Sequence, residues 1–474
     1  MNFNLIPDTI RNSESPLLKW AMTGGYRALT SILLALQLGL LVFSMLYPSS
    51  VFFFLCLKTL LIISILIWLI DREKPTKWLL YGTLLILPGI WGLIIGLSSD
   101  NPGAHYEIPV YLLAPICYLI AFRYARLSFL KSVIPVLKIV CGINLAVFFF
   151  LYFSGGGHLY TILQHATMFV IQQLDGYHKV YTLQATQLIF LLPVILIHFF
   201  FKQNTINFIL VAGCTLMALL IGRKIILIIF VALMMCLCYY SLYRRRSFKH
   251  IIMLVAPVVA ALAVFPQISE FDNQKYMGSV IDSVSSLKPL PDNNLNSPHD
   301  YESKSEHPEL MSKILNWDYL YNSSKNRCSV ENNIKLVASY NDLNATIRNN
   351  QIQILADQIA LSPWLGHGLG YVVKDCIRSS QQPWRFEMTY LAMAMDIGLL
   401  GVFVYCIVYI RWMLGAIRAN LDRSVSFPLL GASLFFLICA ASNPYIMSVE
   451  NLWIFFVPYL LVQIIEVPDF QTMV

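Results

Sequence analysis

Charged side chains are scarce in this chain, and their scarcity indicates its class. Only 12% of the 474 residues are charged, whereas 57% are hydrophobic and the mean hydropathy is +0.64. A soluble globular domain is usually nearer half apolar and a quarter charged. Long apolar runs recur along the whole length, which is typical of a polytopic membrane protein. We therefore expect an all-α protein that lies in a lipid bilayer.

Other absences narrow the class further. No basic run with interleaved aromatic residues occurs, so the net charge of +7 is not a sign of nucleic-acid binding. No small-residue cleavage site follows the first apolar run, which is expected to be an uncleaved first span. No internal repeat is visible, whereas a transporter of the major facilitator type should show two related halves. The histidine spacings match no metal site, so neither a metal nor another cofactor is expected.

The apolar runs predict twelve transmembrane helices. Several are shorter than the usual ~20 residues, so their true ends are expected to extend into the flanking polar residues. The predicted spans are 28–46, 51–70, 78–97, 108–122, 139–153, 182–201, 206–221, 225–242, 250–266, 388–410, 425–443 and 447–466.

Lysine and arginine residues give the expected orientation. They gather in alternate loops, whereas the short loops 47–50, 98–107 and 443–446 contain none. The positive-inside rule therefore predicts that both termini are cytoplasmic. The chain would then divide into nine spans (1–266), one long outer loop (267–387) and three C-terminal spans (388–474).

The outer loop consists of two segments that differ in amino-acid composition. Residues 271–350 are rich in polar residues and Pro, as in PDNNLNSPHDYESKSEHPEL, and are expected to form either a mobile lid or a partly disordered segment. From Arg348 onward, Ile352, Leu355 and Ile359 alternate with polar residues, which predicts an amphipathic helix. The following stretch, LSPWLGHGLG, predicts a tight turn with an exposed backbone.

Two cysteines, Cys328 and Cys376, are the only ones of the ten outside the predicted spans. Both would lie in the outer, oxidising compartment, where disulfides persist. They are either bridged or two unpaired thiols. We predict that they are bridged.

Charged residues near the outer ends of the spans are candidates for function, because ionisable groups at membrane depth are costly. Arg223 and Lys224 form the turn in LLIGRKIILII, where an anion-binding role competes with simple snorkelling. Arg348 heads the predicted amphipathic helix, where a solvated helix end is the alternative. Arg378 and Arg385 flank the tenth span, and we expect one of them to be functional, with Arg385 slightly ahead.

The start of the tenth span also contains acidic residues. Glu387 either takes part in the site or only complements the helix dipole. It shares a face with Tyr390 at i+3, whereas Arg385 at i−2 points away from it. Asp396 is expected to be a buried, hydrogen-bonded group. The acidic cluster Asp300, Glu302, Glu306 and Glu309 is expected to be solvated charge rather than a cation site.

Two stretches of this region, LSPWLGHGLG and WRFEMTYLAMAMDIGLLG, resemble the C-terminal signature of the O-antigen polymerase/O-antigen ligase superfamily. In that signature a Pro-x-x-Gly-x-Gly turn precedes a His or Glu, an aromatic residue and a helix ending in Gly-x-x-Gly. LIGRKIILIIF is similar to the family's helix–Gly/Ser-Arg–helix turn, and Arg348 matches the Arg that commonly heads the amphipathic segment. The resemblance covers roughly residues 205–401 in motif, and it implies a GT-C-like (class B) glycosyltransferase architecture.

The resemblance also implies a chemistry. Such enzymes transfer a glycan from undecaprenyl diphosphate without a metal ion. Guanidinium groups suit the diphosphate because they pair with phosphate oxygens bidentately and stay charged. Glu387 is then the expected base that takes the proton of the attacking sugar hydroxyl. The substrate-binding candidates are Arg223, Arg348, Arg378, Arg385, Tyr390 and Lys179, the last standing where the family often has an arginine.

The sequence is consistent with three functions. A repeat-unit polymerase of a bacterial inner membrane, with a chain-length regulator protein as a partner, is the first expectation. An O-antigen ligase usually has His where this chain has Glu387, which argues against it. A lipid-linked oligosaccharide flippase predicts a charged path through the midplane, where only Lys58 and Asp396 lie.

Overall fold

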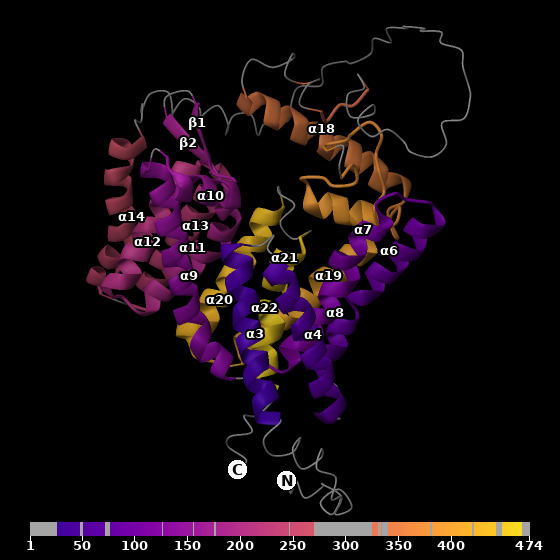
Figure 1. Ribbon diagram of the computed structural model, residues 1–474, viewed down its shortest axis with the longest axis horizontal. Coiled ribbons are helices and arrows are strands. Elements are labelled where there is room, and N and C mark those ends of the chain that lie inside the picture. The colour runs from indigo at the N-terminus through magenta and orange to yellow at the C-terminus, as the bar shows by residue number, and fades with distance from the viewer. Residues whose placement is uncertain are drawn as a thin grey trace, which may run out of the picture.

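The computed structural model describes most of the chain in detail. The described residues are 26–47, 51–71, 76–125, 127–154, 156–174, 177–245, 247–269, 325–329, 333, 340–379, 382–419, 421–441 and 448–466. The predicted lid, 271–350, therefore falls largely outside the described residues, and the acidic cluster at 300–309 falls wholly outside them. The described part is a bundle of helices with one small β-hairpin (Figure 1).

The elements follow one another in this order along the chain: α3 (Tyr26–Leu46), α4 (Val51–Asp71), α5 (Lys77–Thr83), α6 (Ile86–Ser98), α7 (Ala104–Ile108), η2 (Pro109–Leu113), α8 (Ala114–Arg123), α9 (Leu127–Phe153), α10 (His158–Thr167), β1 (Val170–Leu174), β2 (Tyr177–Tyr181), α11 (Gln184–Phe201), α12 (Thr205–Ile221), α13 (Lys224–Tyr243), α14 (Phe248–Ser269), α18 (Tyr340–Leu361), α19 (Thr389–Arg418), α20 (Arg423–Ala440), α21 (Val449–Leu452), η4 (Trp453–Phe456) and α22 (Val457–Glu466).

The predicted membrane class is confirmed. Within the described residues, ten helices are long and apolar enough to cross a membrane. The two remaining predicted spans correspond to shorter apolar helices, Thr205–Ile221 and Val449–Ile464. Two predicted ends are wrong: α9 begins at Leu127 rather than at 139, and α19 continues to Arg418. In both cases the helix extends through charged residues, which a hydropathy criterion assigns to loops.

The C-terminal helices are interleaved with the N-terminal ones. α11 is the central helix, with 89% of its span buried, and α20 packs along it. α19 packs against α6, and α22 packs against both α19 and α8. α13 and α14 lie at the periphery, because only 22% of each span is buried.

Hydrogen bonds between distant segments join loops that were predicted to lie on the same side. Thr76 pairs with Gln463, and Gln203 donates to the carbonyl of His250. At the other end, Asn101 donates to the carbonyl of Leu369. Figure 1 shows α18 lying across that end of the bundle, where the β-hairpin also lies. We call this end the α18 face, and its predicted location is the outer side of the membrane.

The glycine-rich turn 363–370 is packed against backbone, so the prediction of an exposed turn is wrong. α19 is broken at Gly398, whose φ is +73°. The break leaves the carbonyls of Met395 and Asp396 without helical partners, and the N–H groups of His367 and Gly368 donate to them at 2.7 and 3.0 Å. A Cβ atom on Gly398 would lie 2.0 Å from the carbonyl oxygen of Trp364. The approach therefore requires glycine at this position.

The helix predicted from Arg348 is present, but it begins eight residues earlier, at Tyr340. Arg348 therefore lies inside α18 and does not head it. Leu355 and Ile359 are buried as expected, whereas Ile352 is 42% exposed. The buried face includes the polar Gln351, because that side chain forms a hydrogen bond inside the protein. An apolar periodicity could not reveal such a position.

A second loop, 154–181, which lies between two predicted spans and was also expected on the outer side, contains structure that the hydropathy pattern does not reveal. It folds into α10 and the antiparallel hairpin of β1 and β2, in which Gln172 is paired with Lys179. The N–H of Leu183 donates to the carbonyl of Thr167, which fixes the base of this unit on α11.

Cys328 and Cys376 form a disulfide, and their Cα atoms are 4.7 Å apart. The predicted pairing therefore agrees with the structure. The bridge fastens the segment 325–329 to the loop just before Arg378. Asn326 reinforces it, because its amide donates to the carbonyl of Ile377 and its oxygen accepts from the N–H of Ile377.

Replacing both cysteines with serine is expected to destabilise the α18 face. Loss of a native disulfide typically costs roughly 2–5 kcal/mol, through the loop entropy of the unfolded chain. We expect a lower thermal midpoint for purified Cys328→Ser/Cys376→Ser protein in detergent. Cys406→Ser, which removes an exposed free thiol, is the matched control. Equal midpoints for the double variant and the wild type would contradict the expected role.

Candidate functional site

Three arginines and one glutamate gather at the α18 face. Arg223 lies in the turn between α12 and α13, and Arg348 projects from the middle of α18. Arg378 lies in the loop after the disulfide, and Glu387 immediately precedes α19. These residues come from segments that are far apart in the sequence, and we call them the arginine cluster.

Glu387 is at the centre of the arginine cluster. Its Oε2 accepts a hydrogen bond from Nε of Arg348 at 3.1 Å. Its Oε1 accepts from Nε and Nη2 of Arg378 at 3.1 and 3.0 Å. The backbone N–H of Glu387 donates to Oε1 of Gln351 at 3.1 Å. The carboxylate is therefore held from two sides, and the chain that carries it is fixed to α18.

Local backbone structure fixes the positions of Arg223 and Arg378. Gly222 adopts the left-handed conformation that ends α12, and Arg223 is the extended residue before α13. This pair of conformations reverses the chain within two residues, so the Arg223 side chain starts at the tip of the turn. Arg378 follows Cys376 by two residues, and the disulfide together with Asn326 holds its backbone in place.

The electrostatics show that Arg223 belongs to this cluster. Burial lowers the pKa of the Arg223 guanidinium, and the neighbouring Arg348 lowers it further, while Glu387 acts in the opposite direction. Arg223, Arg348 and Arg378 thus bring three guanidinium groups to the surroundings of Glu387. A cluster of guanidinium groups at one surface suits an anionic ligand.

Glu387 is ionised in this arrangement. Burial acts to raise the pKa of its carboxyl group, but Arg378 and Arg348 outweigh burial and hold the pKa below its usual value. Its side chain is 24% exposed, compared with 42% for Arg348 and 22% for Arg378. The Arg348 side of the cluster is thus the more accessible to a ligand.

Arg385 lies in a second ion pair. Its Nε is 3.5 Å from Oε1 of Glu107, a residue of α7 whose side chain is only 2% exposed. Arg378 therefore contacts Glu387, whereas Arg385 contacts Glu107, and the expectation that Arg385 is the functional one of the two stays a prediction. The reason that Arg385 does not contact Glu387 is geometric, since residues two apart at the mouth of a helix point in different directions.

The remaining candidates lie around the cluster. Nζ of Lys179 lies 5.1 Å from the centroid of the Tyr181 ring, and Tyr181 interacts electrostatically with Arg223. The hairpin therefore borders the cluster on the Arg223 side. The hydroxyl of Tyr390 donates to the carbonyl of Leu437 in α20 at 2.6 Å. That bond anchors α19 to α20, so in this structure Tyr390 has a packing role.

Asp396 is buried, as expected, and only 4% exposed. Its Oδ2 accepts a hydrogen bond from the hydroxyl of Tyr111 at 3.3 Å. Tyr111 lies on η2, a π-helical segment within the span Ala104–Arg123. Asp396 thus links the break in α19 to the fourth span and is not a member of the arginine cluster.

Comparisons of the chain with family models, with curated proteins and with solved structures found no match. The site therefore has to be interpreted from its own chemistry.

Three residues in and around the site, Gln351, Glu107 and Asn326, were not predicted from the sequence. Gln351 has a detectable signal, because it lies three residues after Arg348 and so shares its helix face. Glu107 is a carboxylate at the outer end of a predicted span, as Glu387 is, and this position is its signal in the sequence. Asn326 gives no signal in the sequence, because its role depends on two loops that only the fold brings together.

The ion pairs of Glu387 predict a dependence of stability on pH. The pKa of Glu387 is lower in the folded state, so its contribution is present above the unfolded pKa of about 4.3 and is lost as the pH falls through the folded pKa. We expect wild type to have a higher thermal midpoint than Glu387→Gln above about pH 5, and the difference to shrink below about pH 4. A difference that does not change with pH would contradict the ionic origin.

Proposed function

We propose that this protein polymerises lipid-linked oligosaccharide repeat units in a bacterial inner membrane. It would transfer a growing glycan from undecaprenyl diphosphate to the non-reducing end of an incoming lipid-linked repeat unit. The single observation that supports this best is the convergence of Arg223, Arg348 and Arg378 on Glu387 at one face of a membrane bundle. The resemblance of the surrounding motifs to the O-antigen polymerase/ligase superfamily agrees with it.

The arginine cluster suits a diphosphate for physical reasons. A diphosphate diester is anionic at each phosphate, and guanidinium groups bind such oxygens through paired N–H donors. Charge grows on the diphosphate as it leaves, so arginines held in place beforehand stabilise the transition state more than the ground state. The disulfide, Asn326 and the α18 backbone supply this fixed placement.

The proposed reaction needs one proton acceptor. The acceptor hydroxyl oxygen forms a bond to the anomeric carbon of the donor glycan, and the bond from that carbon to the phosphate oxygen breaks. The electron pair stays on the leaving diphosphate, and the hydroxyl proton passes to Glu387. Because the diphosphate is already a good leaving group, no general acid is required.

Competition for the guanidiniums would make Glu387 a better base once the donor is bound. In the present structure both of its oxygens accept from arginine, and its pKa is held low. A diphosphate that recruits Arg348 or Arg378 would remove part of this stabilisation, and the pKa of Glu387 would then rise toward neutral pH. A base works best when its pKa lies near the working pH. Donor binding would thus precede activation of the base.

The flippase alternative has less support. It requires charges along a path through the midplane, and the two candidates are Lys58 and Asp396. Lys58 is exposed on α4, whereas Asp396 is buried against Tyr111. The O-antigen ligase alternative shares the diphosphate site and differs in the acceptor, so it is retained for the test below.

Surface polysaccharide from a deletion strain distinguishes the three functions. Lipopolysaccharide that carries a single repeat unit is the expected result. Unmodified core together with accumulated lipid-linked polymer would identify a ligase. Repeat units accumulated on the cytoplasmic side would identify a flippase. Complementation with the wild-type gene is the control.

A further inference from the structure

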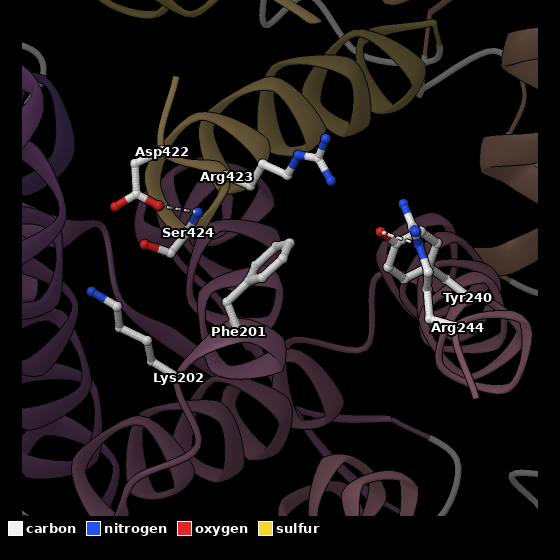
Figure 2. Close-up of a pocket in the computed structure, with 7 residues that line it drawn as sticks. All are labelled: Phe201, Lys202, Tyr240, Arg244, Asp422, Arg423 and Ser424. Atoms are coloured by element: carbon white, nitrogen blue, oxygen red, sulfur yellow. Dashed lines mark hydrogen bonds between the residues drawn. The ribbon is translucent and has the colours of Figure 1, made fainter. Parts of the chain in front are cut away.

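A cavity lies at the end of the bundle opposite the α18 face. Its volume is about 580 Å³, and Figure 2 shows its lining side chains on three helices. They are Phe201, Lys202, Tyr240, Arg244, Asp422, Arg423 and Ser424. Phe201 and Lys202 come from the end of α11, the next two from the end of α13 and the last three from the start of α20. Nothing in the proposed glycan chemistry uses this cavity.

The charge of the cavity is positive. Lys202, Arg244 and Arg423 line it, and among the described residues none of them has a carboxylate within ion-pair distance. The acidic residue at the cavity, Asp422, is already engaged, because its Oδ1 accepts from the N–H of Ser424 as the N-cap of α20. That hydrogen bond is the largest cause that lowers the pKa of Asp422, and Lys202 contributes to it.

The residues that line and border the cavity suit a phosphate that is joined to an apolar group. The guanidinium of Arg244 lies 5.5 Å from the Tyr240 ring, and its Nε donates to the Tyr240 hydroxyl at 3.2 Å. Phe201 lies between the α20 residues and the α13 residues in Figure 2. The outer faces of α13 and α20 are apolar and exposed, for example at Met235 and Leu434. Acyl chains attached to a bound phosphate would therefore have an apolar surface beside the cavity.

We propose that this cavity binds the phosphate headgroup of an anionic membrane phospholipid. Basic pockets between transmembrane helices on the cytoplasmic side suit such headgroups, because cations held at the level of the lipid phosphates attract the anion. The one acidic lining residue, Asp422, accepts the N–H of Ser424, and three cations outnumber it. The bound lipid joins peripheral α13 to α20 and α11. Since only 22% of the α13 span is buried, this contact adds to the few that hold α13 in place.

The proposal is independent of the proposed enzymatic function. The cavity lies at the opposite end of the bundle from Glu387, and its lining residues are separate from the arginine cluster. A binding measurement on the purified protein therefore tests it without any activity assay.

The experiment compares lipids and variants. Full-length protein in a neutral detergent is titrated with phosphatidylglycerol, with phosphatidylcholine and with inorganic phosphate, and the thermal midpoint and the lipid adducts in native mass spectrometry are recorded. A ligand that binds only the folded state raises the midpoint by an amount that grows with the ratio of its free concentration to its dissociation constant. We expect phosphatidylglycerol to raise the midpoint and to give a persistent one-lipid adduct, whereas phosphatidylcholine does neither. Inorganic phosphate should bind weakly because it lacks the apolar part.

A charge-matched pair of variants tests the location. Lys202→Gln/Arg423→Gln should lose at least tenfold in apparent affinity for phosphatidylglycerol. Lys249→Gln/Arg418→Gln removes two exposed cations outside the cavity lining and should keep wild-type affinity. Equal losses in both variants, or equal binding of both phospholipids, would overturn the proposal in favour of general surface charge. Phosphate binding as tightly as phosphatidylglycerol would overturn the lipid assignment.

Discussion

Polymerisation by Glu387→Gln protein is expected to fall by about 10²–10⁴-fold, the usual loss when a general base is removed. Glutamine keeps the shape of the side chain and one acceptor oxygen, but it does not take up a proton at neutral pH. The one amide oxygen of glutamine accepts from only one of the two arginines, because the amide N–H group faces a second donor, so at least one guanidinium is released to the diphosphate. Purified variant assayed on lipid-linked repeat units should therefore bind the donor and yet fail in transfer.

Three magnitudes separate three roles of Glu387. Near-normal turnover would show that Glu387 has only a structural role, in its ion pairs with Arg348 and Arg378 and in complementing the helix dipole, the last a contribution of about 0.3–1 kcal/mol. A partial loss would show that it orients the acceptor hydroxyl without deprotonating it. The matched control is Asp357→Asn, which neutralises an exposed carboxylate on α18 outside the cluster and should leave transfer unchanged.

The positions of the apolar helices were predictable because they depend on local composition. Apolar runs and the placement of Lys and Arg follow from the cost of exposing polar groups to lipid, and each span carries its own signal. The break in α19 at Gly398 was not predictable in this way. It depends on N–H groups of the turn 363–370 that donate to the carbonyls of Met395 and Asp396, and this contact joins a predicted turn to a helix that looked regular in the sequence.

The arginine cluster was only partly predictable. The predicted side of the membrane was the same for Arg223, Arg348, Arg378 and Glu387, so they were expected at one face. The i,i+2 spacing indicated that the Arg385 side chain points away from Glu387. Arg385 is instead paired with Glu107 of α7, in the fourth span. This pairing could not be predicted from the sequence, because only the fold brings Glu107 next to the residues that precede α19. The buried Gln351 likewise interrupts an apolar face in order to hold the Glu387 backbone.

Arg223→Lys is expected to reduce polymerisation by about 10²–10³-fold although the charge is retained, as for the loss of one donor that stabilises a developing anion. An ammonium group lacks the planar fork that binds two phosphate oxygens at once. The variant should insert normally, since the Gly222 turn and the apolar residues of α12 and α13 are unchanged. Surface polysaccharide from a strain carrying the variant should consist mainly of single repeats.

The control for Arg223→Lys is Arg327→Lys. Arg327 is an exposed arginine of the α18 face that contacts Gln353 and lies outside the cluster. Its replacement should leave chain length unchanged, which rules out a general sensitivity of this face to the loss of arginine. Wild-type chain length in the Arg223→Lys strain, at equal protein levels in the membrane, would show that Arg223 serves only as an interfacial cation. The diphosphate site would then be reduced to Arg348 and Arg378, the two arginines that contact Glu387 directly.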